Sequence, residues 1–374
     1  MSNAFFRLAL YCGLCTAFAA LAAKLSAADR IFLRNLEFIT DRTVVAFDDD
    51  RVTLDAARSN GSTTIGWDEI ERATISKDKQ PQFDAMLKEL GTPLYRIRQR
   101  LRTGDYAGLL EPAEELYPRF SSRKSETAYM VCQALMWSRL AVGKREEAVE
   151  PYLRCYDLLR SRAAKVTDIP GDRRLQVDPK TGFSPELTPV WFDAAAARRA
   201  LPAVKQAVES MKQPAPAAAG LYYATLALTA GETAEAKVAL ATLPAEPPVV
   251  GQWWTIARAQ AEVLAEKPGA NVAALQAQRD SLATSAKPAA IYWLGMAALQ
   301  GDDELSRQDG ILELLSLAAI HGKSDAELAA AGLYQAMQAL DKLKDGGGSA
   351  AVRKELLQNY AGTAHAAKVR AAVP

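Results

Sequence analysis

Histidine and cysteine are scarce in this chain, which has two histidines and four cysteines among 374 residues. These residue types supply most ligands of transition metals and many catalytic bases and nucleophiles. The sequence also lacks the nucleophile motif GxSxG, the zinc motif HExxH and a complete phosphate-binding loop. His365 lies on an alanine-rich stretch near the end of the chain and is expected to be exposed. We therefore expect no metal, no cofactor and no enzymatic activity.

An excess of charge of one sign is also absent. Lys and Arg number 45 against 44 for Asp and Glu, so the formal net charge is +1. A nucleic-acid partner is not expected, because such binding draws most of its affinity from positive charge on the protein. Hydrophobic residues make up 49% and charged residues 24%, a composition that excludes a disordered chain and a multi-span membrane protein.

Residues 1–28 have the three parts of a signal peptide. Arg7 precedes an apolar stretch from Leu8 to Ala23, and Ser26 and Ala28 place small residues at positions −3 and −1 of a cleavage site. The apolar stretch is shorter than the roughly 20 residues that a membrane-crossing helix needs. We expect cleavage after Ala28 and a periplasmic or secreted protein.

Two alternatives for this segment stay open, an uncleaved N-terminal anchor and a lipid attached to Cys15. Contact with a membrane is expected only if the segment is retained. Cys12 and Cys15 have the CxxC spacing of redox and zinc motifs, but they lie inside the segment and are assigned no chemistry.

Residues 29–78 are expected to form a small β module. Short runs of β-branched and aromatic residues are separated by turn signals, which predicts three to five strands. The aspartates at 48–50 are interpreted as a solvated turn, since the pattern of an EF-hand calcium loop is not in register. The expected core of the module comprises Leu36, Phe38, Trp67 and Ile70.

After the β module, long alanine- and leucine-rich stretches are bounded by glycine or proline, as is typical of helices. Gly104, Gly143 and Gly231 each precede small or apolar residues at the fifth, ninth and twelfth following positions. This spacing predicts a turn glycine joining two helices, the second of which turns one apolar stripe toward the first. We expect helical repeats over residues 79–165 and 191–374, the latter ending in a C-terminal cap.

The first helix of each expected pair carries an aliphatic-tyrosine pair, at Leu94-Tyr95, Leu221-Tyr222, Ile291-Tyr292 and Leu333-Tyr334. In three of these a glycine follows the tyrosine by nine residues. Together with Gly104-Asp105-Tyr106 and Leu294-Gly295, these features resemble the tetratricopeptide repeat, a helix-turn-helix unit of about 34 residues. The resemblance covers most of residues 90–370 in about five to seven units. Residues 356–363 resemble a repeat junction in exported bacterial proteins of this family.

The resemblance implies a mainly α fold, a helix-turn-helix solenoid preceded by the small β module. It also implies a non-catalytic scaffold of the bacterial envelope that binds a protein or peptide partner on its concave face. The candidate groove residues are Trp137, Tyr223, Trp254 and Tyr292. Adjacent helical residues point about 100° apart, so one ring of an aromatic doublet can enter the core while the other lines the groove or packs structurally.

Residues 166–190 interrupt the repeats, since several prolines and glycines exclude a continuous helix there. A loop of this length is either an ordered surface segment or an element that contacts a ligand. Both interpretations stay open.

Two other functions are retained as alternatives. One is an enzyme of helical-toroid type that uses a pair of carboxylates, a chemistry that needs neither histidine nor cysteine. The other is a purely structural component of the envelope.

Cys132 and Cys155 are a candidate disulfide. They lie equally far from the expected turn at Gly143-Lys144, so an antiparallel hairpin places them at the same depth. Export would deliver them to an oxidising compartment. The alternative is a pair of buried free thiols that act as small hydrophobic residues.

Overall fold

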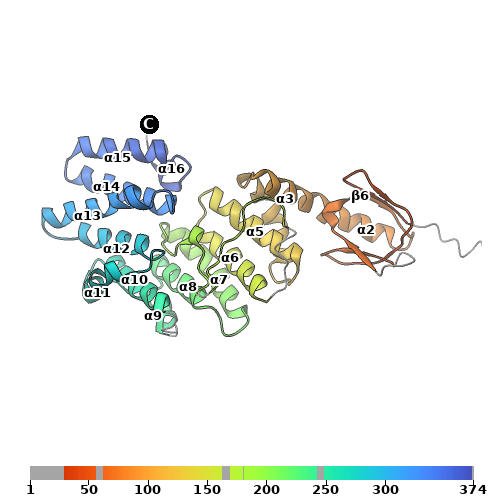
Figure 1. The fold of residues 1–374 in the computed structure, drawn as a ribbon, viewed down its shortest axis with the longest axis horizontal. Helices are drawn as coiled ribbons and strands as arrows, with labels where there is room; N and C mark the ends of the chain where they lie inside the picture. The colour runs from red at the N-terminus through yellow and green to blue at the C-terminus, as the bar shows by residue number, and fades with distance from the viewer. Residues whose placement is uncertain (1–28, 56–61, 162–168, 180, 242–247, 373–374) are drawn as a thin grey trace, which may run out of the picture. The chain divides into compact units, whose positions relative to one another are not determined.

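The computed structural model describes residues 29–55, 62–161, 169–179, 181–241 and 248–372. The chain divides into two compact units between Gln99 and Arg100. The fold is mainly helical with a small sheet module at the start, as expected (Figure 1). The expected signal segment, including Cys12 and Cys15, lies outside the described residues.

The first unit contains two antiparallel three-stranded sheets, with strand orders β2-β1-β6 and β3-β4-β5. Asp48 makes the turn between β3 and β4, where its Oδ1 accepts hydrogen bonds from the amides of Asp50 and Arg51 at 2.9 and 3.0 Å. The aspartates therefore form a turn, as predicted. The described strands are β1 (Arg30–Leu33), β2 (Phe38–Ile39), β3 (Val44–Phe47), β4 (Val52–Leu54), β5 (Thr63–Ile65) and β6 (Ile70–Thr74).

The core of the first unit forms around Trp67. Its ring lies 5.0 Å from that of Phe83 in α2 (Gln80–Met86), and both Trp67 and Ile70 are fully buried, as predicted. The prediction was wrong for Leu36 and Phe38, which are 76% and 65% exposed. Leu36 occupies a turn with a φ of 71°, and Phe38 lies on a two-residue edge strand.

The turn glycines of the helical region adopt the conformation that the spacing predicted. Gly104, Gly143 and Gly231 have φ values of 71°, 75° and 87°, which side chains with a Cβ rarely adopt. Several helices begin at a side chain that accepts a hydrogen bond from the first turn, namely Ser125, Asp193, Asp303, Asp325, Asp345 and Thr363.

The helices that follow α2 include α3 (Thr92–Thr103), within which the division between the two units falls. The helices of the second unit are α4 (Leu110–Phe120), α5 (Glu126–Ala141), α6 (Val149–Arg160), α7 (Ala194–Ser210), α8 (Ala217–Ala230), α9 (Thr233–Ala241), α10 (Pro248–Leu264), α11 (Ala270–Gln278), α12 (Lys287–Leu299), α13 (Glu304–Ser316), α14 (Ala326–Lys342), α15 (Gly346–Asn359) and α16 (Ala364–Ala371).

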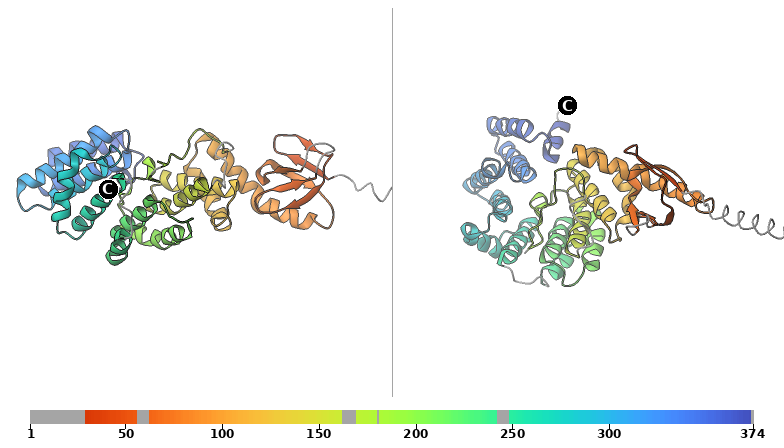
Figure 2. Two further views of the ribbon diagram at one scale, coloured as in Figure 1. Left: turned by 60° about the horizontal axis from the view of Figure 1, so that its bottom comes forward. Right: turned by 45° about the vertical axis from the view of Figure 1, so that its right-hand side comes forward.

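Helices of the second unit pack in a way that is consistent with a helical repeat array. Most successive helices pack against each other, and α8, α10, α12 and α14 also contact one another in that order. The helices from α5 to α16 follow a curve in the right-hand view of Figure 2. The end of the curve returns to its beginning, since a Cβ added to Gly143 after α5 would lie 3.2 Å from the Cβ of Ala364 in α16.

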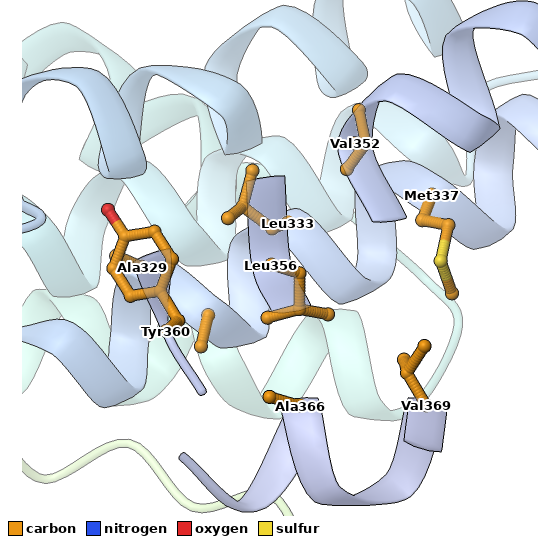
Figure 3. Packing of buried hydrophobic residues seen from close by; sticks show 9 residues of the cluster. Ala329, Leu333, Met337, Val352, Leu356, Tyr360, Ala366 and Val369 are labelled. Carbon is orange, nitrogen blue, oxygen red and sulfur yellow. The ribbon is translucent and has the colours of Figure 1, made fainter. Parts of the chain in front are cut away.

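The C-terminal core is apolar. Leu333 on α14, Leu356 on α15 and Val369 on α16 converge with small and aliphatic neighbours, and Tyr360 closes one side (Figure 3). The Tyr360 hydroxyl donates a hydrogen bond to the carbonyl of Ala318 at 3.3 Å. Burial of these side chains fixes α16 in place, and α16 carries one wall of the site described next.

Candidate functional site

Residues 169–179 and 181–193, here called the inner segment, lie on the inner side of the curve. Its aromatic side chains contact α8, α10 and α12, three helices that lie side by side. The ring of Phe183 lies 5.6 Å from Tyr222 in α8 and 5.1 Å from Trp253 in α10. The ring of Phe192 lies 5.8 Å from Tyr292 in α12. The described part of the expected interruption is therefore an ordered element, and it contains no α-helix.

Two buried tyrosines bond to the backbone of the inner segment. The Tyr152 hydroxyl in α6 donates to the carbonyl of Gly182, and the Tyr222 hydroxyl in α8 accepts from the amide of Ser184 at 3.3 Å. Burial raises the pKa of both tyrosines, so both hydroxyls stay protonated. The tyrosines replace the water that would otherwise satisfy these backbone groups.

Arg145, in the turn after α5, bonds to two further carbonyls. Its Nη1 donates to Glu186 at 3.1 Å and its Nη2 to Thr188 at 2.8 Å. The guanidinium carbon also lies 5.9 Å from the centroid of the Trp191 ring. Arg145 is buried, and hydrogen bonds from a charged donor are among the stronger ones in proteins.

Glu146, the neighbour of Arg145, bonds to the end of the inner segment. Its Oε1 accepts from the amides of Phe192 and Asp193 at 2.8 and 3.0 Å. Asp193 in turn caps α7 by accepting from Ala195 and Ala196 at 2.9 and 3.0 Å. Side chains of the array thus hold donors and acceptors of the main chain from residue 182 to residue 193.

The side chains of this stretch are buried as well. Leu187, Val190 and Trp191 are almost fully covered, and the Trp191 indole donates to Thr225 Oγ1 in α8 at 2.9 Å. Thr188 Oγ1 donates to Asp325 Oδ2 at 2.7 Å, which ties the segment to the start of α14. The stretch, which includes a 3₁₀ turn at Pro185–Leu187, is therefore held through both its main chain and its side chains, as bound peptides are.

The upstream end of the inner segment is held differently. Exposed and half-buried residues alternate from Gly171 to Asp178, as in an extended chain with one side against the array. The guanidinium carbon of Arg173 lies 3.7 Å from the centroid of the Trp137 ring and 5.0 Å from that of Tyr106. Its Nε donates to Glu186 Oε1 at 3.3 Å. Tyr106, Trp137 and Glu186 are called the guanidinium box below.

Several polar atoms around this end are buried without a hydrogen-bond partner. On α5 they belong to Tyr129, Gln133 and Trp137, which recur every four residues and so share one face of the helix. In the guanidinium box, the Oε2 atom of Glu186 is likewise buried without a hydrogen-bond partner. Buried polar atoms without partners are uncommon in folded proteins and call for an explanation, such as an ordered water, an ion or strain.

A pocket of about 140 Å³ lies where the curve closes. His365 is one of its walls and is 3% exposed, so the expectation of an exposed histidine was wrong. Its ring contacts Phe192 at 4.9 Å and Tyr334 at 5.3 Å, and its Nδ1 has no partner. Burial lowers the pKa of His365 to about 4, with a smaller contribution from Lys368.

The carboxyl groups of this pocket serve structural contacts. Glu147 Oε1 lies 3.2 Å from Arg199 Nη2, and Glu146 and Asp193 make the backbone bonds given above. Burial raises the pKa of Glu327, which accepts a hydrogen bond from the amide of Ala364. Glu146 and Glu147 thus join the turn after α5 to the region around α7, and Asp193 caps α7 itself.

The four expected groove residues occupy different surroundings. Trp137 and Tyr292 are buried against the inner segment, through Arg173 and Phe192 respectively. Tyr223 and Trp254 face α9 instead. The Tyr223 hydroxyl bonds to Glu235, and the Trp254 indole donates to the carbonyl of Leu240 at 3.1 Å. In the described residues these four side chains do not line an open groove.

In two of the aromatic doublets, the other member contacts the inner segment. Tyr222 and Trp253, the neighbours of Tyr223 and Trp254, contact the inner segment. Sequence alone could not choose between them, because the direction of each ring depends on the rotation of its helix. Arg145, Glu146 and Tyr152 were missed altogether, since nothing in the sequence sets them apart from other polar residues on helices.

Cys132 and Cys155 are buried free thiols in the structure. They lie within hydrogen-bonding reach of each other, and burial raises the pKa of Cys155 well above its ordinary value. The Cys155 thiol also donates to the carbonyl of Tyr129 at 3.9 Å. The spacing from the turn correctly placed the pair side by side, and disulfide formation stays a prediction.

The described residues contain no group of three or more His, Cys, Asp and Glu side chains arranged to hold a metal ion. Within the same residues, no helix combines the length and the apolar character needed to span a membrane. The chain matches no known protein family, no curated protein and no solved structure.

Proposed function

We propose that the second unit is a non-catalytic binding module, a solenoid of tetratricopeptide-like hairpins that holds an extended stretch of polypeptide on its inner face. One observation supports this most strongly, the set of side chains that bond to the main chain of residues 182–193. Contacts to main-chain groups suit any extended peptide, and pockets for alternate side chains add selectivity. In this state the chain's own inner segment fills the face, and a protein partner binds by replacing part of it.

The proposed setting is the bacterial envelope. This rests on the signal-like sequence of residues 1–28 and on the resemblance to exported repeat proteins. N-terminal sequencing of the protein from its native host tests the export step. A chain that begins near Asp29 supports it, and a retained Met1 or a lipid on Cys15 contradicts it.

The binding function is tested by removing the part of the inner segment that occupies the inner face of the helical array. Residues 181–192 are replaced by a glycine-serine stretch of equal length, and a labelled peptide with the sequence of residues 179–193 is added. We expect saturable binding to this variant, weaker binding of a scrambled peptide and no binding to the unmodified protein. A variant that keeps its helical circular-dichroism spectrum but binds neither peptide contradicts the proposal.

A further inference from the structure

The guanidinium box differs from the rest of the inner face because Arg173, which occupies it, leaves two of its polar atoms without a hydrogen bond. Arg173 meets Glu186 through Nε alone, at 3.3 Å from Oε1. The second carboxylate oxygen, Oε2, is buried and unpaired, and so is the indole nitrogen of Trp137. A guanidinium commonly pairs with a carboxylate through two parallel hydrogen bonds, and that geometry is the stronger one.

The reason for this incomplete pairing lies in the chain itself. Arg173 and Glu186 belong to the same segment, and the main chain at Glu186 is fixed by the hydrogen bond from Arg145 to its carbonyl. Arg173 approaches the carboxylate with the side of its guanidinium. An arginine from another chain is free of this restriction and can approach with its end, reaching both oxygens.

The rest of the box is already suited to a guanidinium. The two ring distances, 3.7 Å to Trp137 and 5.0 Å to Tyr106, are within the range of favourable cation–π contacts. Burial raises the pKa of Glu186, and Arg173 opposes this shift. An arriving arginine can take over this role of Arg173 beside the carboxylate.

We propose that Tyr106, Trp137 and Glu186 form a binding site for an arginine side chain of the partner, with Arg173 as the resident occupant that the partner's arginine displaces. The inference rests on the proposed function for its choice of partner, an extended polypeptide. The site itself depends only on the box. The unpaired polar atoms of Tyr129 and Gln133 lie on the face of α5 that carries Trp137, where they can bond to the main chain that follows the arginine.

The first test empties the box in the full-length protein. Arg173→Ala removes the occupant, and Arg174→Ala is the matched control, because the Arg174 side chain donates to the carbonyls of Gly171 and Arg173 within the segment itself. Isothermal calorimetry with ethylguanidinium should show saturable binding to Arg173→Ala and none to the unmodified protein or to Arg174→Ala. If Arg173→Ala does not fold, Arg173→Gln is measured in its place.

The second test asks whether the carboxylate carries the recognition. Adding Glu186→Gln to Arg173→Ala, the vacated variant, should weaken ethylguanidinium binding about tenfold or more, since a pair of charge-assisted hydrogen bonds is lost. Butylammonium, a cation without the planar fork, should bind the vacated variant less tightly than ethylguanidinium. Absence of binding to a folded vacated variant overturns the site, and so does equal binding with and without Glu186.

The third test separates a partner's arginine from a free guanidinium compound. A peptide with the sequence of residues 171–178 should bind Arg173→Ala more tightly than the same peptide carrying alanine in place of its first arginine. Binding of ethylguanidinium without this peptide preference keeps the box but overturns its assignment to a protein partner. The proposed function is judged separately by the replacement of residues 181–192, so the two failures can be told apart.

Discussion

The two parts of the inner segment show how differently one stretch of chain can be held. In the downstream part, residues 181–193, the array bonds to main-chain groups and buries Leu187, Val190 and Trp191. In the upstream part, residues 171–178, one side chain, Arg173, makes the main contact and polar atoms nearby stay unpaired. We therefore expect the downstream part to be held more firmly than the upstream part, so that the proposed exchange with a partner begins more readily at the upstream part.

The largest expected effect is in the downstream part. Trp191→Ala removes a buried ring and its hydrogen bond to Thr225, and we expect it to lower the free energy of unfolding by about 3–5 kcal/mol. Urea denaturation followed by circular dichroism measures the change. Arg174→Ala in the upstream part is the control and should cost less than about 0.5 kcal/mol. Equal losses in the two variants would mean that the two parts do not differ.

Acid should weaken the downstream end. His365 contacts Phe192, and its pKa in the folded protein is about 4, against an ordinary value of 6.5. The unfolded chain therefore takes up a proton between these values while the folded one does not, so stability falls as the pH drops from 6.5 to 4. The loss is on the order of 3 kcal/mol.

A variant without a titratable ring isolates this contribution. His365→Phe keeps an aromatic side chain between Phe192 and Tyr334 and should remove most of the pH dependence in this window. The measurement is the free energy of unfolding from urea titrations at pH 4.5 and pH 7. If His365→Phe and the unmodified protein lose the same stability on acidification, His365 is not the group responsible.

Two glycines provide a matched pair for the comparison. Gly182 in the downstream part has a φ of 80°, and a Cβ added there would lie 2.8 Å from the ring of Tyr156. Gly171 in the upstream part has a φ of 91°, and a Cβ added there would lie 2.3 Å from the carbonyl oxygen of Leu101. Gly182→Ala should cost about 2 kcal/mol more than Gly171→Ala, because the upstream part can lift away from its clash. Thermal unfolding measures both, and a greater cost at Gly171 would show that the upstream part is held firmly.

The sequence predicted the elements better than the site. Turn glycines such as Gly143 and the depth match of Cys132 with Cys155 follow from local spacing, and the structure agrees with both placements. The inner segment could not be placed, because its contacts with α8, α10 and α12 join residues far apart in the chain. His365 was misjudged for the same reason, since its burial arises from Phe192 and Tyr334.

We expect the downstream part to be held as firmly as a core helix and the upstream part to open far more readily. Hydrogen–deuterium exchange with mass spectrometry tests this expectation most directly, because amide exchange reports local opening. We predict that peptides covering residues 183–193 exchange as slowly as those from α8, and that peptides covering residues 171–178 exchange at least about a hundredfold faster, a difference of about 2.7 kcal/mol in opening free energy. Equal protection across the whole inner segment would contradict the account.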